Sequence, residues 1–201
     1  MASIKTGAGH PALAFVNTKY GVADRAVDGL TTFSDLIDWL RAAGLIRADV
    51  ARNLCTRTAA GAKAAVLARA LSFRRQLRAL CEKLSAGCGC TANDIAFINR
   101  ALSKHRELVR IRLKGGRIQR VYIADVLVCE HIVPALAMLS VSLLEEDLTL
   151  IRRCKNTTSC TLFFYDRTKN HRRVWCSTSA CGNRAKVLEY RRRQAAWKNK
   201  P

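Results

Sequence analysis

The chain has 201 residues, and 49% of them are hydrophobic, so a packed core is available and a wholly disordered protein is excluded. Its 35 Lys and Arg residues outnumber 15 Asp and Glu residues, which gives a formal net charge of +20 and favours a polyanionic partner. The longest run without a charged residue or histidine, residues 132–144, is shorter than the roughly 20 apolar residues of a membrane helix. Without an apolar segment of signal-peptide length near the start, we expect a cytoplasmic protein with no membrane partner.

The first predicted elements are helices. Residues 31–43 form an amphipathic pattern in which Leu36, Ile37 and Leu40 share one face, a Ser or Thr caps the start and Gly44 ends the helix. A longer helix is predicted over about 58–85. Thr91 and Asp94 resemble a capping box and predict a third helix that continues through Leu102.

A β-hairpin is predicted next, because the apolar period changes to two. Val109, Ile111 and Leu113 alternate with arginines, a Gly-Gly pair turns the chain, and residues 118–123 are rich in β-branched and aromatic side chains. Residues 125–150 are again helical in pattern, and Pro134 either kinks that helix or starts its second half. Residues 1–150 are therefore predicted to form a mainly α domain with one small β-hairpin, an α+β arrangement.

Charge and cysteine content change near Ile151. Residues 151–201 contain fourteen basic residues and only Asp166 and Glu189 as acidic ones. The same segment contains four of the nine cysteines in two pairs, Cys154 with Cys160 and Cys176 with Cys181. Two close pairs of thiolates across a short loop suit one tetrahedral Zn²⁺, which would stabilise a segment with few apolar side chains. The alternative is a set of buried free thiols, which rarely cluster in a polar, basic segment.

The C-terminal module is predicted to combine a β-hairpin with a basic helix. Residues 162–165 form a strand-like apolar run that can pair with residues 174–175, and residues 185–197 are compatible with a helix. A basic helix on a metal knuckle can enter a major groove or follow phosphates, whereas the alternative is a solvated basic tail. His171 could replace a cysteine as ligand, but four cysteines are already available. A second metal or redox site at Cys81, Cys88 and Cys90 is disfavoured because further ligands are missing.

The sequence resembles the CGNR zinc-finger family. The residues that carry the resemblance are Trp175-Cys176-Ser177, Cys181-Gly182-Asn183-Arg184 with Lys186 and Arg191, and Phe164-x-Asp166-Arg167-Thr168-x-Asn170. The upstream part resembles the ABATE domain of stress-induced transcription regulators, through Phe15-Val16-Asn17-Thr18 and through Leu36–Leu45, which fits L-x-x-W-L-x-x-x-G-L. The chain departs from the family pattern in having five residues between Cys154 and Cys160, and in having Thr168 and Thr178 where Ser and Met are usual.

The resemblance implies one structural zinc ion held by Cys154, Cys160, Cys176 and Cys181, a DNA-binding module and an upstream domain that binds an unspecified small molecule. The candidate nucleic-acid contacts are Arg172, Arg173, Asn183, Arg184, Lys186, Arg191, Arg192 and Arg193. Asn183 can also cap the following helix, which is the favoured role, or bond a ligand thiolate, and Gly182 is expected to permit the turn at the fourth ligand. The candidate ligand-binding residues are Asn17, Thr18, Arg25 and Arg74, and the alternative is that Asn17 caps a helix while the arginines are surface charges.

These features predict a cytoplasmic, nucleoid-associated zinc-finger transcription regulator with DNA as its partner. Its N-terminal domain, residues 1–150, is expected to sense a small molecule or a partner. Residues 151–201 form the zinc module in this hypothesis, and a homodimer would suit a palindromic site. An RNA-binding zinc protein is the first alternative, although few aromatic residues accompany the C-terminal basic residues. An enzyme with a catalytic N-terminal pocket is the second alternative, and the lack of a recognisable nucleophile–base pair disfavours it.

Overall fold

The computed structural model describes residues 7–22, 26–103, 109–114, 117–122 and 128–198. Its helices are α1 (Pro11–Val16), α2 (Phe33–Ala42), α3 (Ala48–Arg57), α4 (Ala60–Ser85), α5 (Ala92–Leu102), α6 (Ile132–Leu144) and α7 (Asn183–Lys198). Single helical turns are η2 (Cys129–His131), η3 (Leu148–Leu150) and the π-type turn η4 (Thr178–Gly182). The strands form three antiparallel pairs: β1 (Lys19–Tyr20) with β2 (Val27–Asp28), β3 (Val109–Lys114) with β4 (Arg117–Tyr122), and β5 (Ile151–Arg153) with β6 (Phe163–Tyr165).

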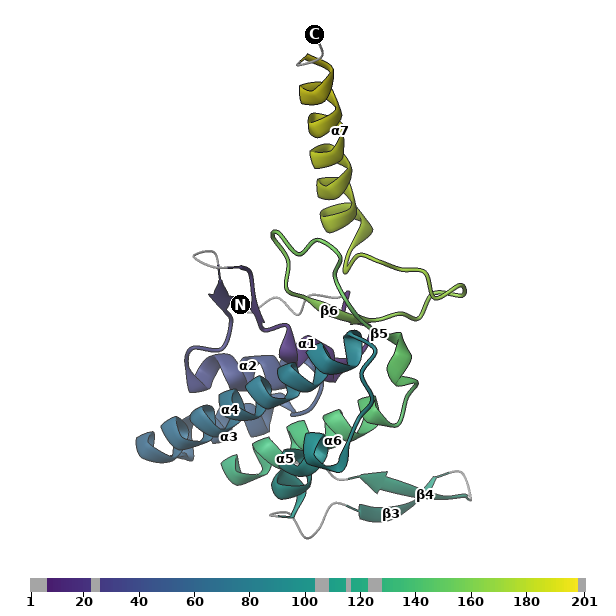
Figure 1. Ribbon diagram of the computed structural model, residues 1–201. Coiled ribbons are helices and arrows are strands. Elements are labelled where there is room, and N and C mark those ends of the chain that lie inside the picture. Colours follow the sequence, from purple (N-terminus) through teal and green to yellow (C-terminus); the bar gives the residue numbers. More distant parts are fainter. Residues whose placement is uncertain (1–6, 23–25, 104–108, 115–116, 123–127, 199–201) are drawn as a thin grey trace.

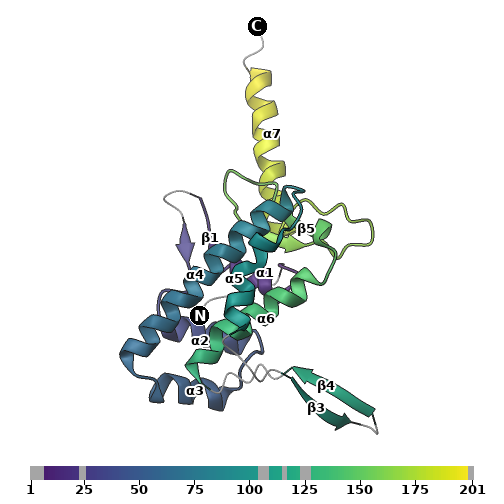
Figure 2. The ribbon, with the colours of Figure 1, turned by 60° about the horizontal axis from the view of Figure 1, so that its bottom comes forward.

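The chain is mainly helical with small β-hairpins, as the sequence predicts. Helices α1 to α6 form the body, the β3–β4 hairpin extends from one end of it, and α7 projects from the other (Figures 1 and 2). Among the described residues, no helix is both long and apolar enough to cross a membrane.

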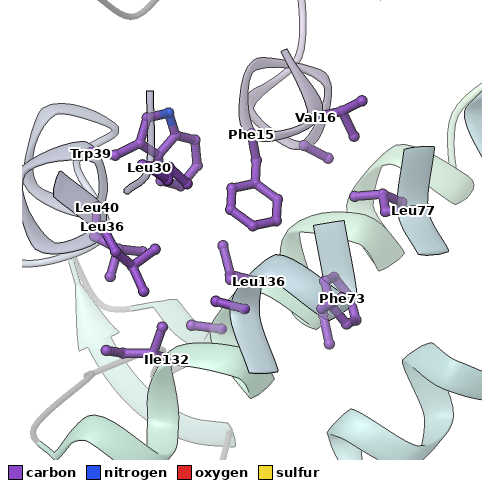
Figure 3. Close-up of a cluster of buried hydrophobic side chains, with 14 of the residues drawn as sticks. Phe15, Val16, Leu30, Leu36, Trp39, Leu40, Phe73, Leu77, Ile132 and Leu136 are labelled. Atoms are coloured by element: carbon purple, nitrogen blue, oxygen red, sulfur yellow. The ribbon is translucent and has the colours of Figure 1, made fainter. Parts of the chain in front are cut away.

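The core of the body lies between α1, α2, α4 and α6. Phe15 and Trp39 pack with their ring centroids 5.1 Å apart, and Leu77 and Leu136 extend toward them from α4 and α6 (Figure 3). These side chains are almost completely buried, and burial of each large apolar side chain stabilises the fold by roughly 1.5–3 kcal/mol. Aliphatic and aromatic residues at helical spacing therefore organise the body.

Local sequence signals explain where several helices begin and end. Thr32 caps α2 in a capping box with Asp35, whose carboxylate accepts hydrogen bonds from the backbone N–H groups of Thr31 and Thr32. Gly44 follows α2 with a φ of +73°, a backbone conformation that favours glycine. The predicted Thr91 capping box also starts α5. These boundaries follow from side chains close in sequence.

The structure confirms one long helix and shortens another. The helix predicted over about 58–85 is α4, Ala60–Ser85, whereas α3, which precedes it, was not predicted. The helix predicted over 125–150 is α6, Ile132–Leu144, and Pro134 lies in its first turn, where the missing N–H breaks no hydrogen bond. Residues 123–127 lie outside the described residues.

The C-terminal hairpin also pairs differently from the prediction. Strand β6 pairs with β5, with Ile151 opposite Tyr165, and not with residues 174–175. Val174 instead accepts one hydrogen bond, from the Lys155 N–H, at 3.0 Å. The domain boundary predicted near Ile151, where acidic residues almost vanish, stays a prediction. Ile151 itself is 1% exposed and belongs to the core of the body.

Candidate functional site

Strand β6 lies between the core of the body and the C-terminal cysteines. Phe163 and Tyr165 pack into the core of the body, whereas Phe164 packs into a second cluster with the cysteine side chains. Because successive residues of a strand face opposite sides, one strand contributes to both clusters. The run of three buried aromatic residues is therefore the shared wall between the helical body and the cysteine site.

The four C-terminal cysteines converge on one point. The sulfur atoms of Cys154, Cys160, Cys176 and Cys181 all lie within 4.8 Å of one another, and all four residues are buried. The Cys160 and Cys176 sulfurs are 3.6 Å apart, and those of Cys176 and Cys181 are 3.5 Å apart. With Zn–S bonds of about 2.3 Å, the sulfurs of a tetrahedral site lie about 3.8 Å apart. The arrangement fits one zinc ion.

The electrostatics of the four thiols also favour a cation. A hydrogen bond with Cys176 lowers the pKa of the Cys160 thiol to about 5. The same hydrogen bond and burial raise the pKa of Cys176, and burial raises the pKa of Cys181 to about 11. Without a cation, the neutral thiols of Cys176 and Cys181 are therefore favoured. Metal binding requires all four cysteines as thiolates, and a divalent cation offsets the repulsion among them.

Glycine at position 182 reflects close packing. Its φ is not in the left-handed region, but a Cβ at this position would lie 3.2 Å from the Trp175 ring. Glycine was expected at position 182 to permit a turn at the fourth ligand. The structure instead requires it there because a larger residue would contact the aromatic ring. Trp175 in turn packs against the cysteine cluster.

A buried carboxylate organises the loop between β6 and Cys176. Asp166 is 0% exposed and accepts hydrogen bonds from the backbone N–H of Thr168 and of Arg173, at 3.1 and 3.0 Å. The Thr168 hydroxyl also donates to Asp166, at 2.6 Å. Although burial opposes it, these hydrogen bonds lower the pKa of Asp166. Threonine supplies the same hydroxyl as the serine usual at this position, so that departure keeps the interaction.

The N-terminal residues hold the cysteine module against the body. Gly7 accepts a hydrogen bond from the Arg173 guanidinium at 2.9 Å, Ala8 accepts one from the Tyr165 N–H at 2.8 Å, and Gly9 accepts one from Arg167 at 2.9 Å. A Cβ on Gly7 would lie 2.5 Å from the Cys176 carbonyl oxygen. Backbone atoms of the N-terminal segment and of the cysteine module are thus in direct contact, which was not predicted from the sequence. Glycine at positions 7 and 9 is the local feature that permits this close approach.

Two of the predicted ligand-binding residues have side chains engaged within the protein. Asn17 donates from Nδ2 to the Phe163 carbonyl at 2.7 Å and accepts from the Phe163 N–H at 2.9 Å. The Thr18 hydroxyl donates to the Phe15 carbonyl and accepts from Arg74, both at 2.7 Å. Asn17 is also the C-cap residue of α1, and its backbone N–H donates to the last turn of that helix. Its amide therefore joins α1 to β6, and a ligand contact by Asn17 stays a prediction.

Arg74 forms a buried ion pair. Its side chain is 4% exposed, and its guanidinium donates to both carboxylate oxygens of Asp28 on β2. Although burial opposes it, the hydrogen bonds and the charge of Arg74 lower the pKa of Asp28. The pair connects α4 to the β1–β2 hairpin. Arg25, the fourth predicted ligand-binding residue, lies outside the described residues.

The predicted nucleic-acid contacts separate into two groups. Exposed residues are Arg172, Asn183, Arg184, Lys186, Arg191, Arg192 and Arg193. Arg173 differs, because its guanidinium donates to the carbonyls of Gly7, Trp175 and Cys176 and lies 4.4 Å from the centroid of the Phe164 ring. Arg173 therefore stabilises the module, a role that was not predicted from sequence.

Comparison with known families identifies both parts of the chain. Residues 9–147 match the model of ABATE, described as "Putative stress-induced transcription regulator", and residues 151–194 match the model of the CGNR zinc finger. The chain belongs to the ABATE family. A search of the curated proteins finds no match. At the family level, an ABATE protein with a CGNR zinc finger is a zinc-finger regulator, and its four clustered cysteines are suited to one zinc ion.

Proposed function

We propose that this ABATE protein binds duplex DNA through α7 and regulates transcription in response to a small molecule. The observation that carries the proposal is the exposure of α7, which projects from the zinc module and contacts η4 at its root (Figures 1 and 2). Residues 183–198 contain six basic residues and one acidic residue, Glu189, which pairs with Arg193. A projecting, strongly basic helix suits a polyanion.

Four of the six basic residues of α7 lie on two opposite sides of the helix. Arg184 and Arg191 are two turns apart and share one face, whereas Lys186 and Arg193 share the face about 180° away. An α-helix with side chains is about 10–12 Å wide, close to the roughly 12 Å width of the major groove. A helix in that groove has a DNA phosphate backbone on either side. Cations on two opposite faces suit this position better than contact with a single flat surface.

The zinc ion has a structural role in this proposal. Four thiolates complete a tetrahedral coordination sphere, so no position remains for a water or substrate, unlike a catalytic zinc site. The ion joins the Cys154–Cys160 knuckle to η4, which leads directly into α7. We infer that the protein is a binding protein and not an enzyme, and that it acts in the cytoplasm at the nucleoid.

The test is duplex DNA binding by the zinc-loaded chain at several salt concentrations. Arg191→Ala should weaken binding to all sequences and reduce the salt slope by about 1, because one phosphate contact is lost. Arg52→Ala, on the exposed face of α3, is the matched control and should leave the slope unchanged. Removal of zinc by a chelator should abolish binding. Binding that survives zinc removal, or an unchanged slope for Arg191→Ala, would contradict the proposal.

An RNA partner is the alternative, and a separate competition experiment distinguishes it from duplex DNA. Tyr190 and Trp197 are 63% and 78% exposed on α7, and exposed aromatic side chains can stack on unpaired bases. Competition between duplex DNA and single-stranded RNA at matched salt should favour the duplex. If RNA displaces the duplex completely, the DNA assignment is wrong and α7 is an RNA-binding element. A homodimer on a palindromic site stays a prediction, to be measured by sedimentation with and without DNA.

A further inference from the structure

A cavity of about 640 Å³ lies between the N-terminal residues and the zinc module. Gly7, Asn17 and Tyr20 contribute to one side of it, and Ser159 and Arg184 contribute to the other. Cys160, Cys176 and Cys181 also border the cavity. One metal ion at the cysteines occupies about the space of a water molecule, roughly 30 Å³, so most of the volume is available to another molecule. Its size is typical of small-molecule sites.

The lining of this cavity combines apolar side chains with polar and cationic ones. It contains the two guanidinium groups of Arg173 and Arg184 and several hydroxyl groups, and none of its described lining residues is acidic. Arg184 donates to the Ser159 hydroxyl at 3.0 Å, a neutral partner. Arg173 donates to backbone carbonyls, which are neutral as well. Neither guanidinium has a carboxylate among these partners.

The charge of the metal site does not cancel this excess. Four thiolates with one zinc ion carry two negative charges, whereas residues 151–194 contain twelve basic and two acidic residues. The module therefore stays strongly positive when zinc is bound. Apolar side chains complete the lining, including Leu162 and Phe163. A ligand that matches both features has a negative group and a small apolar part.

We infer that this cavity binds a small organic anion, with a carboxylate or phosphate group held by Arg184 and an apolar part against β6. Arg184 is the second residue of α7 and is also a proposed DNA contact. The anion and a DNA phosphate therefore compete for one guanidinium, and this coupling rests on the proposed DNA binding. Because coupling between two ligands is reciprocal, the anion weakens DNA binding by the same factor that DNA weakens anion binding.

The first experiment measures anion binding without DNA. Isothermal titration calorimetry of the zinc-loaded full chain, at constant ionic strength, uses benzoate, inorganic phosphate and the neutral analogue benzamide. Benzoate or phosphate should bind saturably at one site, and benzamide should bind at least tenfold more weakly. Binding of benzoate alone identifies a carboxylate site, and binding of phosphate alone identifies a phosphate site. Equal binding of benzamide and benzoate, or binding of neither anion, would overturn the inference.

The second experiment compares two matched variants on the same helix. Arg184→Gln should weaken anion binding about tenfold or more, because a charge-assisted hydrogen bond is lost. Arg191→Gln, two turns farther along α7 and outside the cavity lining, should bind the anion as the unmodified chain does. Zinc content is measured for both variants to confirm an intact module. Unchanged anion binding by Arg184→Gln shows that the anchor is not Arg184 and overturns the inference.

The third experiment tests the competition. At constant ionic strength, the anion that binds should weaken duplex binding by the unmodified chain and should have no effect on Arg184→Gln. An anion that leaves duplex affinity unchanged would refute the competition. If the chain binds the anion but no duplex, the proposed DNA function fails while the anion site stands. The two failures are therefore distinguishable.

Discussion

The amide of Asn17 offers a sharp test of how the two parts of the chain are joined. Asn17 is 5% exposed, and its side chain makes two hydrogen bonds with the backbone of Phe163, at 2.7 and 2.9 Å. Asn17→Ala leaves one buried N–H and one buried carbonyl without these partners. An unsatisfied buried polar group costs about 1–3 kcal/mol, so for two such groups we expect a loss of about 2–6 kcal/mol in the free energy of unfolding.

The assay is equilibrium urea denaturation followed by far-ultraviolet circular dichroism, at a fixed concentration of free zinc. Asn99→Ala, an exposed asparagine on α5, is the matched control and should change stability by less than about 0.5 kcal/mol. A loss below about 0.5 kcal/mol for Asn17→Ala would refute the reasoning, because a buried amide that joins α1 to β6 cannot be removed without cost. Such a result would favour a ligand contact as the role of this residue.

A second substitution separates loss of the amide from loss of its donor. Asn17→Asp keeps an acceptor for the Phe163 N–H but places a buried carboxylate against the Phe163 carbonyl. At neutral pH it should destabilise at least as much as Asn17→Ala, because a buried charge lacks a partner. Its deficit should shrink as pH falls, since a protonated carboxyl group can donate to that carbonyl. A deficit independent of pH would contradict the assigned geometry.

Three further predictions concern the metal site, a glycine and an ion pair. Cys176→Ser should lower zinc affinity more than about 100-fold in a chelator competition, while the helical signal of the body persists. The control Cys55→Ser should leave zinc affinity unchanged. Equal zinc affinities of the two variants would show that the cluster does not bind the ion. Gly9→Ala should destabilise more than Gly44→Ala in thermal or urea unfolding. Both positions have a positive φ, where a side chain costs about 1–2 kcal/mol. Of the two, only a Cβ at Gly9 would meet a backbone carbonyl oxygen, at 2.7 Å. Equal losses of stability would therefore contradict the close contact at Gly9. Asp28→Asn should cost about 3–5 kcal/mol at neutral pH by leaving a buried arginine unpaired. Because the folded-state pKa of Asp28 is lowered, the contribution of the pair is complete above the unfolded pKa, about 3.9, and is lost as pH falls through the folded pKa. The stability difference from the unmodified chain should therefore shrink in acid, and a constant difference would exclude the pair as its source.

Sequence patterns within a few residues predicted much of the local structure and the metal site. The apolar period gave α2 and the β3–β4 hairpin, and the Thr91–Asp94 pair gave the start of α5. Four cysteines in two close pairs predicted the zinc ligands, because the spacing of each knuckle limits how far apart its two sulfurs can lie. The basic excess after Ile151 predicted the character of α7. Each of these features depends on neighbours in the sequence.

Contacts between distant segments decided the rest. Asn17 and Phe163 are 146 positions apart, and Arg173 reaches the carbonyl of Gly7 across 166 positions. The sequence around an asparagine or an arginine does not indicate which distant carbonyl its side chain will contact. Asn17, expected to face a ligand pocket or to cap a helix, also connects α1 to β6 as a buried residue, and Arg173 is a stabilising residue of the module. The cavity beside Arg184 exists only because the folded chain brings its two ends together around β6.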